Sequence, residues 1–289
     1  MASICLIIPF FSETRLSLIR NRKLRKVFKP RQFPHYFEHF IGTFRQNTSI
    51  DLKILTNISY KDKYAKYQTR NVTFHGMELS RLVQLFEQKL GFKFQNFNPY
   101  KLCDLKPTYG FVFSDYLKVY DFWGYCDIDM VIGNLGSFLT PENLDGYDMV
   151  SASKGNPGYM TLYRNTEKMN LLFKKNPNHL QIFGSAQYYK FDEGGKKGKN
   201  GIIALQQIVE QESIKIHNLV NLVHNDGGKF NQTRNWRYLW EKGCLTDCLT
   251  QQEVGSLHLV KSKKRKGFLI EAFQENRVLE ITDSGICNQ

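Results

Sequence analysis

The sequence predicts an α/β domain in which helices flank a mostly parallel, doubly wound sheet. Short apolar runs typical of buried strands alternate with segments whose apolar residues recur at helical spacing. The chain has 289 residues, enough to bury a large core, and no internal repeat or clear linker divides it. We therefore expect a single domain over residues 1–289, with a basic insertion at about 13–33.

The first third of the chain predicts alternating strands and helices. In order, these are a strand at 3–11, a helix at 34–47, strands at 51–56 and 72–75, and a helix at 78–90 that Gly91 closes. Ligands bind at the carboxyl ends of strands in a doubly wound sheet. Pro9, Phe10 and Thr56 are therefore candidate binding residues, although Thr56 equally suits a plain turn.

The remainder of the chain continues the alternation around an acidic strand. We expect a helix within 99–121 whose start is limited by Pro107, strands at 122–132, 147–152 and 159–164, helices at 166–173 and 202–211, and strands within 214–223 and 254–260. Helices that connect strands in this way place the strands in one largely parallel sheet.

The acidic strand carries the strongest indication of a site. Apolar residues run from Phe122 up to Asp127 and Asp129, and then resume. If the strand stays regular, the two carboxylates share one face. They repel each other and are costly to bury, and a hard cation such as Mg²⁺ or Mn²⁺ removes that cost while it binds phosphate oxygens. The simpler alternative is a strand end with two solvated acids.

Charged residues elsewhere are candidates for the same site. Lys101, Asp104 and Lys106 precede the acidic strand, where they would hold phosphate oxygens and orient a ligand. A surface ion pair of little energetic weight is the alternative. His258 lies on a predicted strand, three residues before Lys261, and is a candidate third metal ligand. A histidine of the core or the surface is the alternative there.

The net charge of +13 indicates an anionic partner, namely nucleotide phosphates, an anionic membrane surface, an acidic glycan or nucleic acid. Basic residues cluster at 15–31, 196–199 and 261–266. The first cluster fits an amphipathic helix on an anionic membrane, an insertion that clasps a charged acceptor, or a solvated loop. We expect no specific nucleic acid partner, because no nucleic-acid-binding motif appears.

Several features indicate a cytoplasmic protein. No apolar run reaches membrane-spanning length, and the opening segment has the character of a first strand rather than a signal peptide. The six cysteines lack the spacing of a zinc site, so reduced thiols are expected. The basic insertion would extend this prediction to a peripheral place on the inner face of the cell membrane.

The residues of the acidic stretch also carry a resemblance. Asp127-Ile128-Asp129 after an aromatic strand resembles the Asp-x-Asp signature of glycosyltransferases with the GT-A fold. The blocks Pro99–Pro107 and Asp121–Asp129 resemble a family of bacterial, capsule-type glycosyltransferases long known as a domain of unknown function. The segments Ile7–Phe11, Met160–Asn165, Phe191–Glu193 and His258–Lys261 fit the same pattern, so the resemblance spans most of the chain. It departs in the basic insertion, where relatives are shorter, which leaves the acceptor and any membrane contact open.

The resemblance implies a GT-A glycosyltransferase that uses Mn²⁺ or Mg²⁺ and a nucleotide-sugar donor, with UDP favoured. Its acceptor would be a hydroxyl of a glycan or lipid-linked glycan in bacterial surface polysaccharide synthesis. Carried over to this sequence, Asp127 contacts ribose and metal, and Asp129 and His258 ligate the metal. Lys261 then meets the diphosphate. A metal and a lysine stabilise the charge that the leaving nucleoside diphosphate gains as the glycosidic bond breaks.

Asp192 and Glu193 are the candidates for the base that activates the acceptor. A carboxylate near the anomeric carbon takes the hydroxyl proton if its pKa suits, which implies an inverting enzyme. If neither acid reaches the acceptor, a retaining mechanism becomes possible. The alternative is an acid pair that caps a helix.

Two other functions compete with glycosyl transfer. A haloacid-dehalogenase-type phosphatase also uses Asp-x-Asp at a strand end, but on its first strand and before a small hydroxyl residue and glycine, whereas Met130-Val131-Ile132-Gly133 follows here. A non-catalytic binder of acidic glycan or nucleic acid fits the charge and the aromatic residues, but it leaves the acid pair unexplained.

Overall fold

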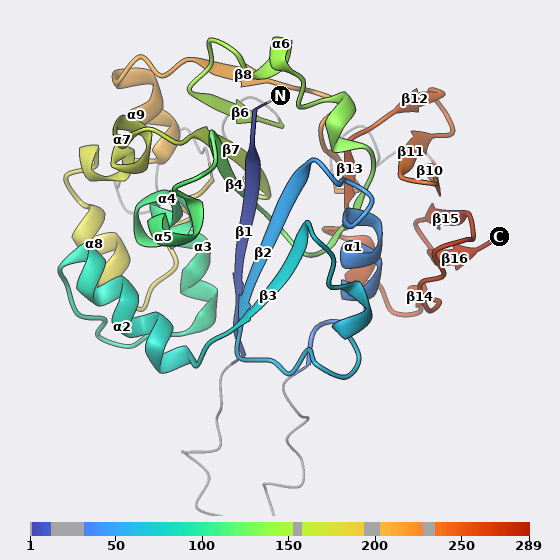
Figure 1. The fold of residues 1–289 in the computed structure, drawn as a ribbon, viewed down its shortest axis with the longest axis horizontal. Coiled ribbons are helices and arrows are strands. Elements are labelled where there is room, and N and C mark those ends of the chain that lie inside the picture. Colours follow the sequence, from blue (N-terminus) through green and yellow to red (C-terminus); the bar gives the residue numbers. More distant parts are fainter. Residues whose placement is uncertain (1, 13–31, 153–157, 194–202, 228–234) are drawn as a thin grey trace, which may run out of the picture.

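The computed structural model describes residues 2–12, 32–152, 158–193, 203–227 and 235–289. Its largest sheet has seven strands in the order β3-β2-β1-β4-β7-β6-β8 (Figure 1). These are β1 (Ile4–Phe10), β2 (Ile50–Thr56), β3 (Val72–Gly76), β4 (Phe122–Cys126), β6 (Met149–Ser151), β7 (Met160–Arg164) and β8 (Ile216–Asn218). Strand β7 is antiparallel to both of its neighbours, and the other pairs are parallel. The predicted α/β class with a mostly parallel sheet is confirmed.

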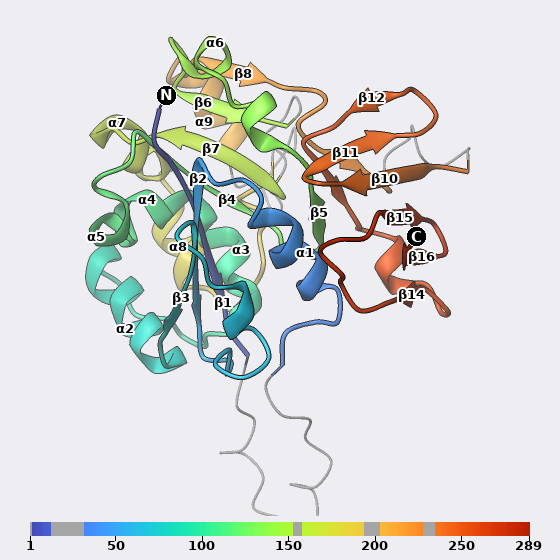
Figure 2. The ribbon, with the colours of Figure 1, turned by 45° about the vertical axis from the view of Figure 1, so that its right-hand side comes forward.

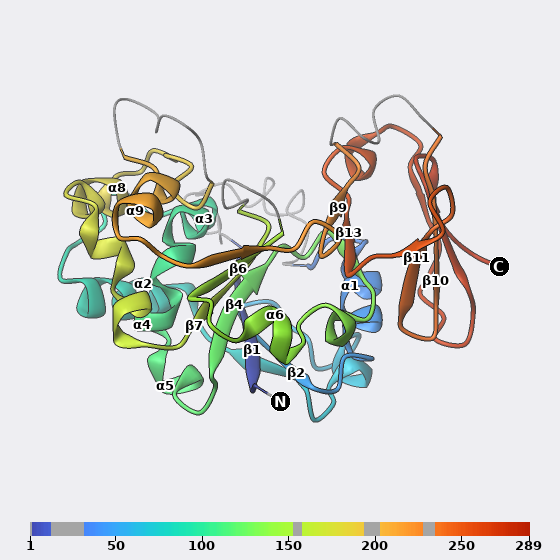
Figure 3. The ribbon, with the colours of Figure 1, turned by 90° about the horizontal axis from the view of Figure 1, so that it is seen from above.

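Strand β1 is buried on both faces of this sheet. Leu6 and Ile8 belong to one apolar cluster, and Cys5 and Ile7 belong to another. Because side chains alternate along a strand, a strand that is apolar at every position has to be covered on both sides. Figure 3 shows α1 (Phe37–Phe44) on one side of the sheet and most of the other helices on the opposite side.

The helical layer on that opposite side is built mainly from short segments. It includes α2 (Leu79–Leu90), α3 (Leu102–Leu105), α4 (Tyr109–Val112), α5 (Ser114–Leu117), α7 (Glu167–Asn170), α8 (His179–Gly184) and α9 (Leu205–Gln211), while α6 (Pro141–Leu144) precedes β6. Gly91 closes α2 as predicted, with a left-handed φ of +73° and its N–H donated to Glu87 O. The helix expected within 99–121 is instead divided into short α-helical and 3₁₀-helical segments, and the division between α3 and α4 falls at Pro107, which lacks the N–H that a helix interior requires.

The acidic stretch differs from the regular strand that the sequence predicts. Strand β4 ends at Cys126, and β5 (Met130–Ile132) belongs to a second sheet of three strands in the order β5-β13-β9. Asp127 and Asp129 therefore lie where the chain leaves one sheet for the other. The Asp127 N–H donates to Tyr159 O at 2.8 Å. A turn between two sheets, rather than strand alternation, brings the carboxylates together.

The sequence analysis did not predict a third sheet, which the C-terminal part of the chain forms (Figure 2). In spatial order its strands are β12 (Gln252–Glu253), β11 (Cys244–Asp247), β10 (Arg237–Glu241), β15 (Leu279–Thr282), β16 (Gly285–Asn288) and β14 (Leu269–Ile270). In β10, Tyr238 and Trp240 are buried while Arg237 and Glu241 are exposed. Such alternation over so few residues is a weak signal, which explains the omission.

Helix α1 packs between the main sheet and this C-terminal sheet. The ring of Phe273 lies 5.8 Å from the ring of His39 in α1 and 5.9 Å from that of Trp240 in β10. Trp240 also donates its indole N–H to Ile132 O in β5 at 2.9 Å. One apolar cluster includes residues of β1, α1, β10 and β15. The single domain over residues 1–289 stays a prediction.

Two of the three basic clusters predicted from the sequence lie almost entirely outside the described residues. Apart from residues 32 and 33, the predicted insertion at about 13–33 lies outside the described residues, and so does the cluster at 196–199. The cluster at 261–266 is described and borders the candidate site. None of the helices in the described ranges combines the length and apolar character needed to cross a membrane. The six cysteines are free thiols.

Trp240 tests the contact between the sheets. We expect Trp240→Ala to lower the free energy of unfolding by about 3–5 kcal/mol, because it leaves a cavity in the shared core. Trp240→Phe should cost about 1–3 kcal/mol, because Ile132 O loses a buried donor. Urea unfolding measures both. Leu249→Ala, at an exposed side chain, is the matched control. Equal stability of the control and Trp240→Ala would contradict this packing.

Candidate active site

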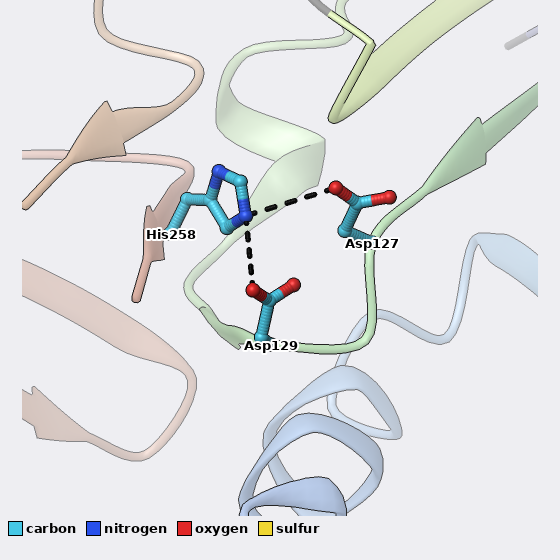
Figure 4. A group of neighbouring side chains, drawn as sticks. All are labelled: Asp127, Asp129 and His258. Carbon is cyan, nitrogen blue, oxygen red and sulfur yellow. Dashed lines mark ion pairs between the residues drawn. The ribbon is translucent and has the colours of Figure 1, made fainter. Parts of the chain in front are cut away.

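Asp127, Asp129 and His258 bring three potential ligand atoms within 4.8 Å of one another (Figure 4). His258 Nε2 lies 3.2 Å from Asp129 Oδ2 and 3.7 Å from Asp127 Oδ2. Asp129 and His258 are buried, whereas 34% of the Asp127 side chain is exposed. The three residues that the sequence predicts as metal ligands are therefore neighbours in space.

The pairing of β13 (Ser256–His258) with β5 places the imidazole beside the acids. His258 is the partner of Met130 in this antiparallel pair, and Met130 directly follows Asp129. The Leu259 N–H donates to Asp129 O at 2.8 Å, which continues the contact. Strand register thus joins two segments that are far apart in the sequence.

The chemistry of this donor set fits a divalent cation. Carboxylate oxygens suit Mg²⁺ and Mn²⁺, and an imidazole nitrogen makes Mn²⁺ the better match. Burial lowers the pKa of His258, and the charge of Asp127 opposes that effect. A lowered pKa favours the neutral ring, which is the form that ligates metals. The Nδ1 atom of His258 is buried and has no hydrogen-bond partner among the described residues.

The basic run after β13 adds positive charge to the site. The ammonium of Lys263 contacts Asp129 Oδ2, and its pKa is lowered to about 8 by burial, with Asp127 opposing. Lys264 lines the same cleft. Lys263 contacts an acid and Lys264 lines the cleft, whereas the predicted contact of Lys261 with the diphosphate stays a prediction. The sequence indicated a basic cluster here, but its spacing did not show which lysine points inward.

Asp226 holds the basic run in place. Its carboxylate accepts the backbone N–H groups of Lys261 at 2.9 Å and Ser262 at 2.7 Å. Its own N–H donates to His258 O at 3.1 Å. The side chain of Lys261 packs beside Gly227, where an added Cβ would lie 3.4 Å from Lys261 Cε. A buried acid that the sequence analysis missed therefore fixes the turn that presents Lys263.

Lys106 joins Asp127 of the candidate metal cluster to a third carboxylate, that of Asp192. Its ammonium lies 2.8 Å from Asp127 Oδ1 and 3.3 Å from Asp192 Oδ2, and it donates to Gly158 O at 2.5 Å. Burial alone lowers the pKa of Lys106, but Asp127 and Asp192 outweigh it and raise this pKa well above the usual value. The lysine is therefore a charged bridge under the cleft.

Asp192 and Glu193 both line the cleft, as the sequence analysis requires of a candidate base. Burial raises the pKa of Asp192 to about 7, against the opposing charge of Lys106. At Gly158, an added Cβ would lie only 2.5 Å from Asp192 Oδ2, so a glycine is needed for this close approach. Glu193 lies nearer the surface and contacts Tyr188 and Lys190.

Two hollows meet at the acid cluster. The first is a mostly apolar cavity of about 320 Å³ at the carboxyl end of β1, with Pro9, Phe10 and Tyr125 in its walls. The second is a wider cleft of about 880 Å³ that contains His258 and Asp192. Asp127, Asp129 and Lys106 line both of them. Pro9 and Phe10 thus lie where the sequence predicts a ligand.

Three other predicted binding residues lie away from these hollows. Lys101 and Asp104 are buried and pair with each other at 2.8 Å. Their further hydrogen bonds go to backbone atoms of residues 187, 189 and 191. The pair therefore braces the segment that carries Asp192. Thr56 is also buried, and its hydroxyl accepts the Ile58 N–H, which is the plain turn that was its alternative.

Comparisons with known proteins give one family and several solved structures. A family model described as a family of unknown function, DUF6625, matches residues 31–288. A search of curated proteins gives no match. The structure of the apo bifunctional glycosyltransferase WbbM is similar with a TM-score of 0.47 and 10% identity, over 90% of this chain and 46% of that one. The present chain thus spans less than half of the WbbM chain.

Two further solved structures are similar to this one over most of the length of both chains. The galactosyltransferase LgtC, in complex with donor and acceptor sugar analogues, has a TM-score of 0.44 and 11% identity, over 89% of this chain and 87% of that one. Mouse xyloside xylosyltransferase 1, in its apo form, has a TM-score of 0.45 and 8% identity, over 92% of this chain and 99% of that one.

Removing one carboxylate charge tests whether the cluster binds a metal ion. We expect Asp129→Asn to weaken Mn²⁺ binding by at least about 100-fold, because a carboxylate ligand is lost from a three-residue set. Titration with Mn²⁺, followed by electron paramagnetic resonance, measures the affinity. Asp62→Asn, at an exposed acid outside the cluster, is the matched control. Equal Mn²⁺ affinity of the two variants would contradict the assignment.

The raised pKa of Asp192 predicts a pH-dependent stability. The folded protein keeps this proton up to about pH 7, whereas the unfolded chain releases it near its ordinary value of 3.8. The folded state therefore binds more protons in this window, and its stability falls as the pH rises from about 4 to 7. Asp192→Asn should flatten this decline in urea unfolding, while Asp62→Asn should leave it unchanged. Parallel curves for wild type and Asp192→Asn would refute the shift.

Proposed function

The chain belongs to the DUF6625 family of unknown function, and we propose that it is a metal-dependent glycosyltransferase with a GT-A fold. It moves a sugar from a nucleotide-diphosphate donor to an acceptor hydroxyl. The observation that carries the proposal is the placement of the Asp127, Asp129 and His258 cluster at the junction of an apolar cavity and a polar cleft. A nucleotide sugar has a matching division into a base with flat apolar faces, a charged diphosphate and a polar sugar.

The apolar cavity receives the base and ribose. Pro9, Phe10 and Tyr125 provide flat apolar walls, which favour a planar base. The exposed part of Asp127 at the cavity mouth accepts a hydrogen bond from a ribose hydroxyl. The donor diphosphate then lies over Asp129, within reach of Lys263 and Lys264.

The residues around the acids stabilise the leaving group. A divalent cation bound by Asp127, Asp129 and His258 supplies positive charge against the negative charge that develops on the diphosphate. Lys263 and Lys264 add donors for phosphate oxygens from the same side. These interactions strengthen as the glycosidic bond breaks, and for this reason they lower the barrier rather than only improve binding.

Asp192 is the stronger candidate for the base. It lies in the cleft and not in the apolar cavity, which puts it on the acceptor side. With a pKa of about 7 it can hold and release a proton near neutral pH. Lys106 and Tyr188 contact its two oxygens and fix the direction of the carboxylate. An acceptor hydroxyl that reaches Asp192 gives up its proton as it attacks the anomeric carbon, with inversion.

The proposal also names a class of donor and a class of acceptor. The resemblance of the Asp-x-Asp block favours a UDP-sugar with Mn²⁺, and an acceptor in bacterial surface polysaccharide. A non-catalytic binder of acidic glycan remains the competing function, and the high net charge of +13 favours it. Only the transferase needs a cation site beside a base-sized apolar cavity.

Thermal melting in the presence of nucleotides tests the proposal. We expect UDP with Mn²⁺ to raise the melting temperature of the wild type by several degrees, since a ligand of the native state stabilises it by mass action. Without Mn²⁺, or in Asp129→Asn, the shift should vanish. UMP, ADP and GDP serve as comparison ligands. A melting temperature that no nucleotide changes with Mn²⁺ would favour the binder.

A further inference from the structure

Tyr100 presents an aromatic ring to solvent at the wall of the polar cleft. Its side chain is 63% exposed, which makes it the most exposed aromatic residue in the part of the chain that the structure describes. The ring packs edge-on against Tyr188, with centroids 4.9 Å apart and planes at 72°. Both tyrosines line the cleft, and Tyr100 also lines the apolar cavity, so its ring stands where the two hollows meet. An exposed apolar ring at the rim of a hollow is a common feature of ligand sites.

Carboxylates stand directly beside this pair of rings. The Tyr188 hydroxyl donates to Glu193 Oε1 at 2.9 Å and lies 3.3 Å from Asp192 Oδ1. Lys190 Nζ lies 3.1 Å from Glu193 Oε2. Among the described residues, these contacts leave each Glu193 oxygen a further lone pair, because a carboxylate accepts about four hydrogen bonds. An aromatic face and hydrogen-bond acceptors thus adjoin each other.

The segment that carries these groups is held rigidly from below. Asp104 accepts the N–H groups of Tyr189 and Phe191, and Lys101 donates to Gln187 O. Lys190 has a left-handed φ of +58°, a conformation that costs energy for a residue with a side chain. The buried pair that the sequence assigned to the donor therefore pre-organises the turn at residues 187–193.

We propose that Tyr100, Tyr188 and Glu193 form the subsite for a pyranose ring of the acceptor, an inference that rests on the glycosyl-transfer function proposed above. The C–H groups on one face of the ring lie over the negative face of Tyr100. Hydroxyl groups at the ring edge donate to Glu193. The neighbouring Asp192 then faces the hydroxyl that is to be glycosylated.

The charges of the subsite select the kind of sugar. Glu193 pairs with Lys190 and Asp192 pairs with Lys106, so the subsite carries little net charge and takes a neutral pyranose. Acidic groups elsewhere on a longer acceptor can meet Lys264 at the cleft wall. A lipid chain would cover the remaining lone pairs of the carboxylates without donating to them, and it therefore fits the subsite poorly.

Binding of simple glycosides tests the subsite directly. The probes are methyl α- and β-pyranosides of glucose, galactose and mannose, added to the full chain with UDP and Mn²⁺. Saturation-transfer NMR detects binding, and titration gives the dissociation constant. We expect at least one methyl glycoside to bind the wild type. Tyr100→Ala should weaken that binding about fivefold to tenfold, and Tyr100→Phe, which keeps the ring, by no more than about twofold.

Further variants distinguish a specific loss of glycoside binding at the subsite from a general disturbance of the fold. Glu193→Gln should weaken binding of the same glycoside, because an amide accepts fewer hydrogen bonds than a carboxylate. Tyr147→Ala is the matched control. Tyr147 stacks on His217 near the amino end of β6, whereas the cleft lies beyond the carboxyl end of β4. This variant should bind the glycoside as the wild type does.

The outcomes distinguish this inference from the proposed function. Failure of every methyl glycoside to bind while UDP and Mn²⁺ do bind would overturn the subsite and leave the donor site intact. Binding that Tyr100→Ala does not change, or that only octyl glycosides show, would also overturn it, the latter in favour of an apolar chain. Tyr100-dependent glycoside binding without any UDP binding would support the subsite while it contradicts the donor proposal.

Discussion

The candidate site depends on one buried ammonium group. Lys106 Nζ contacts Asp127 Oδ1, Asp192 Oδ2 and Gly158 O, which come from three separate segments of the chain. An unpaired charge so deeply placed would be strongly destabilising, and the same holds for the carboxylates without the lysine. Each partner therefore requires the others, and the connection after β4, the segment before β7 and the turn at residues 187–193 are held in one arrangement.

Lys106 also separates the site into two parts. On one side of Lys106 lie Asp127, Asp129 and His258, with the apolar cavity at the end of β1. On the other lie Asp192 and Glu193, while the exposed ring of Tyr100 borders both hollows. We infer that the first side serves the donor and the second the acceptor. A charge shared across the boundary keeps the two sides at a constant separation, which transfer between two bound molecules requires.

The sequence identified site residues best where a residue pattern is costly to bury without a ligand. An Asp-x-Asp pair between apolar runs and a late histidine are costly unless they bind something, so Asp127, Asp129 and His258 stood out in the sequence. Lys106 stood out too, but its role as a bridge did not. Lys101 and Asp104 looked the same in the sequence as Lys106, yet they are buried under a neighbouring turn. Tyr100, Tyr188, Asp226 and Lys263 are ordinary residues whose part in the site comes only from what lies beside them.

The sequence by itself determined the α/β class, the strands from β1 to β4, the end of α2 at Gly91 and the acid pair, because each follows from local periodicity or local chemistry. Only the tertiary structure decided that the chain leaves the main sheet after Cys126, that β13 sets His258 beside the two acids, and that Lys263 contacts Asp129. It also decided the C-terminal sheet, whose strands are too short to have a clear period. These features depend on strand register and on side-chain contacts between distant segments, and no local pattern records such contacts.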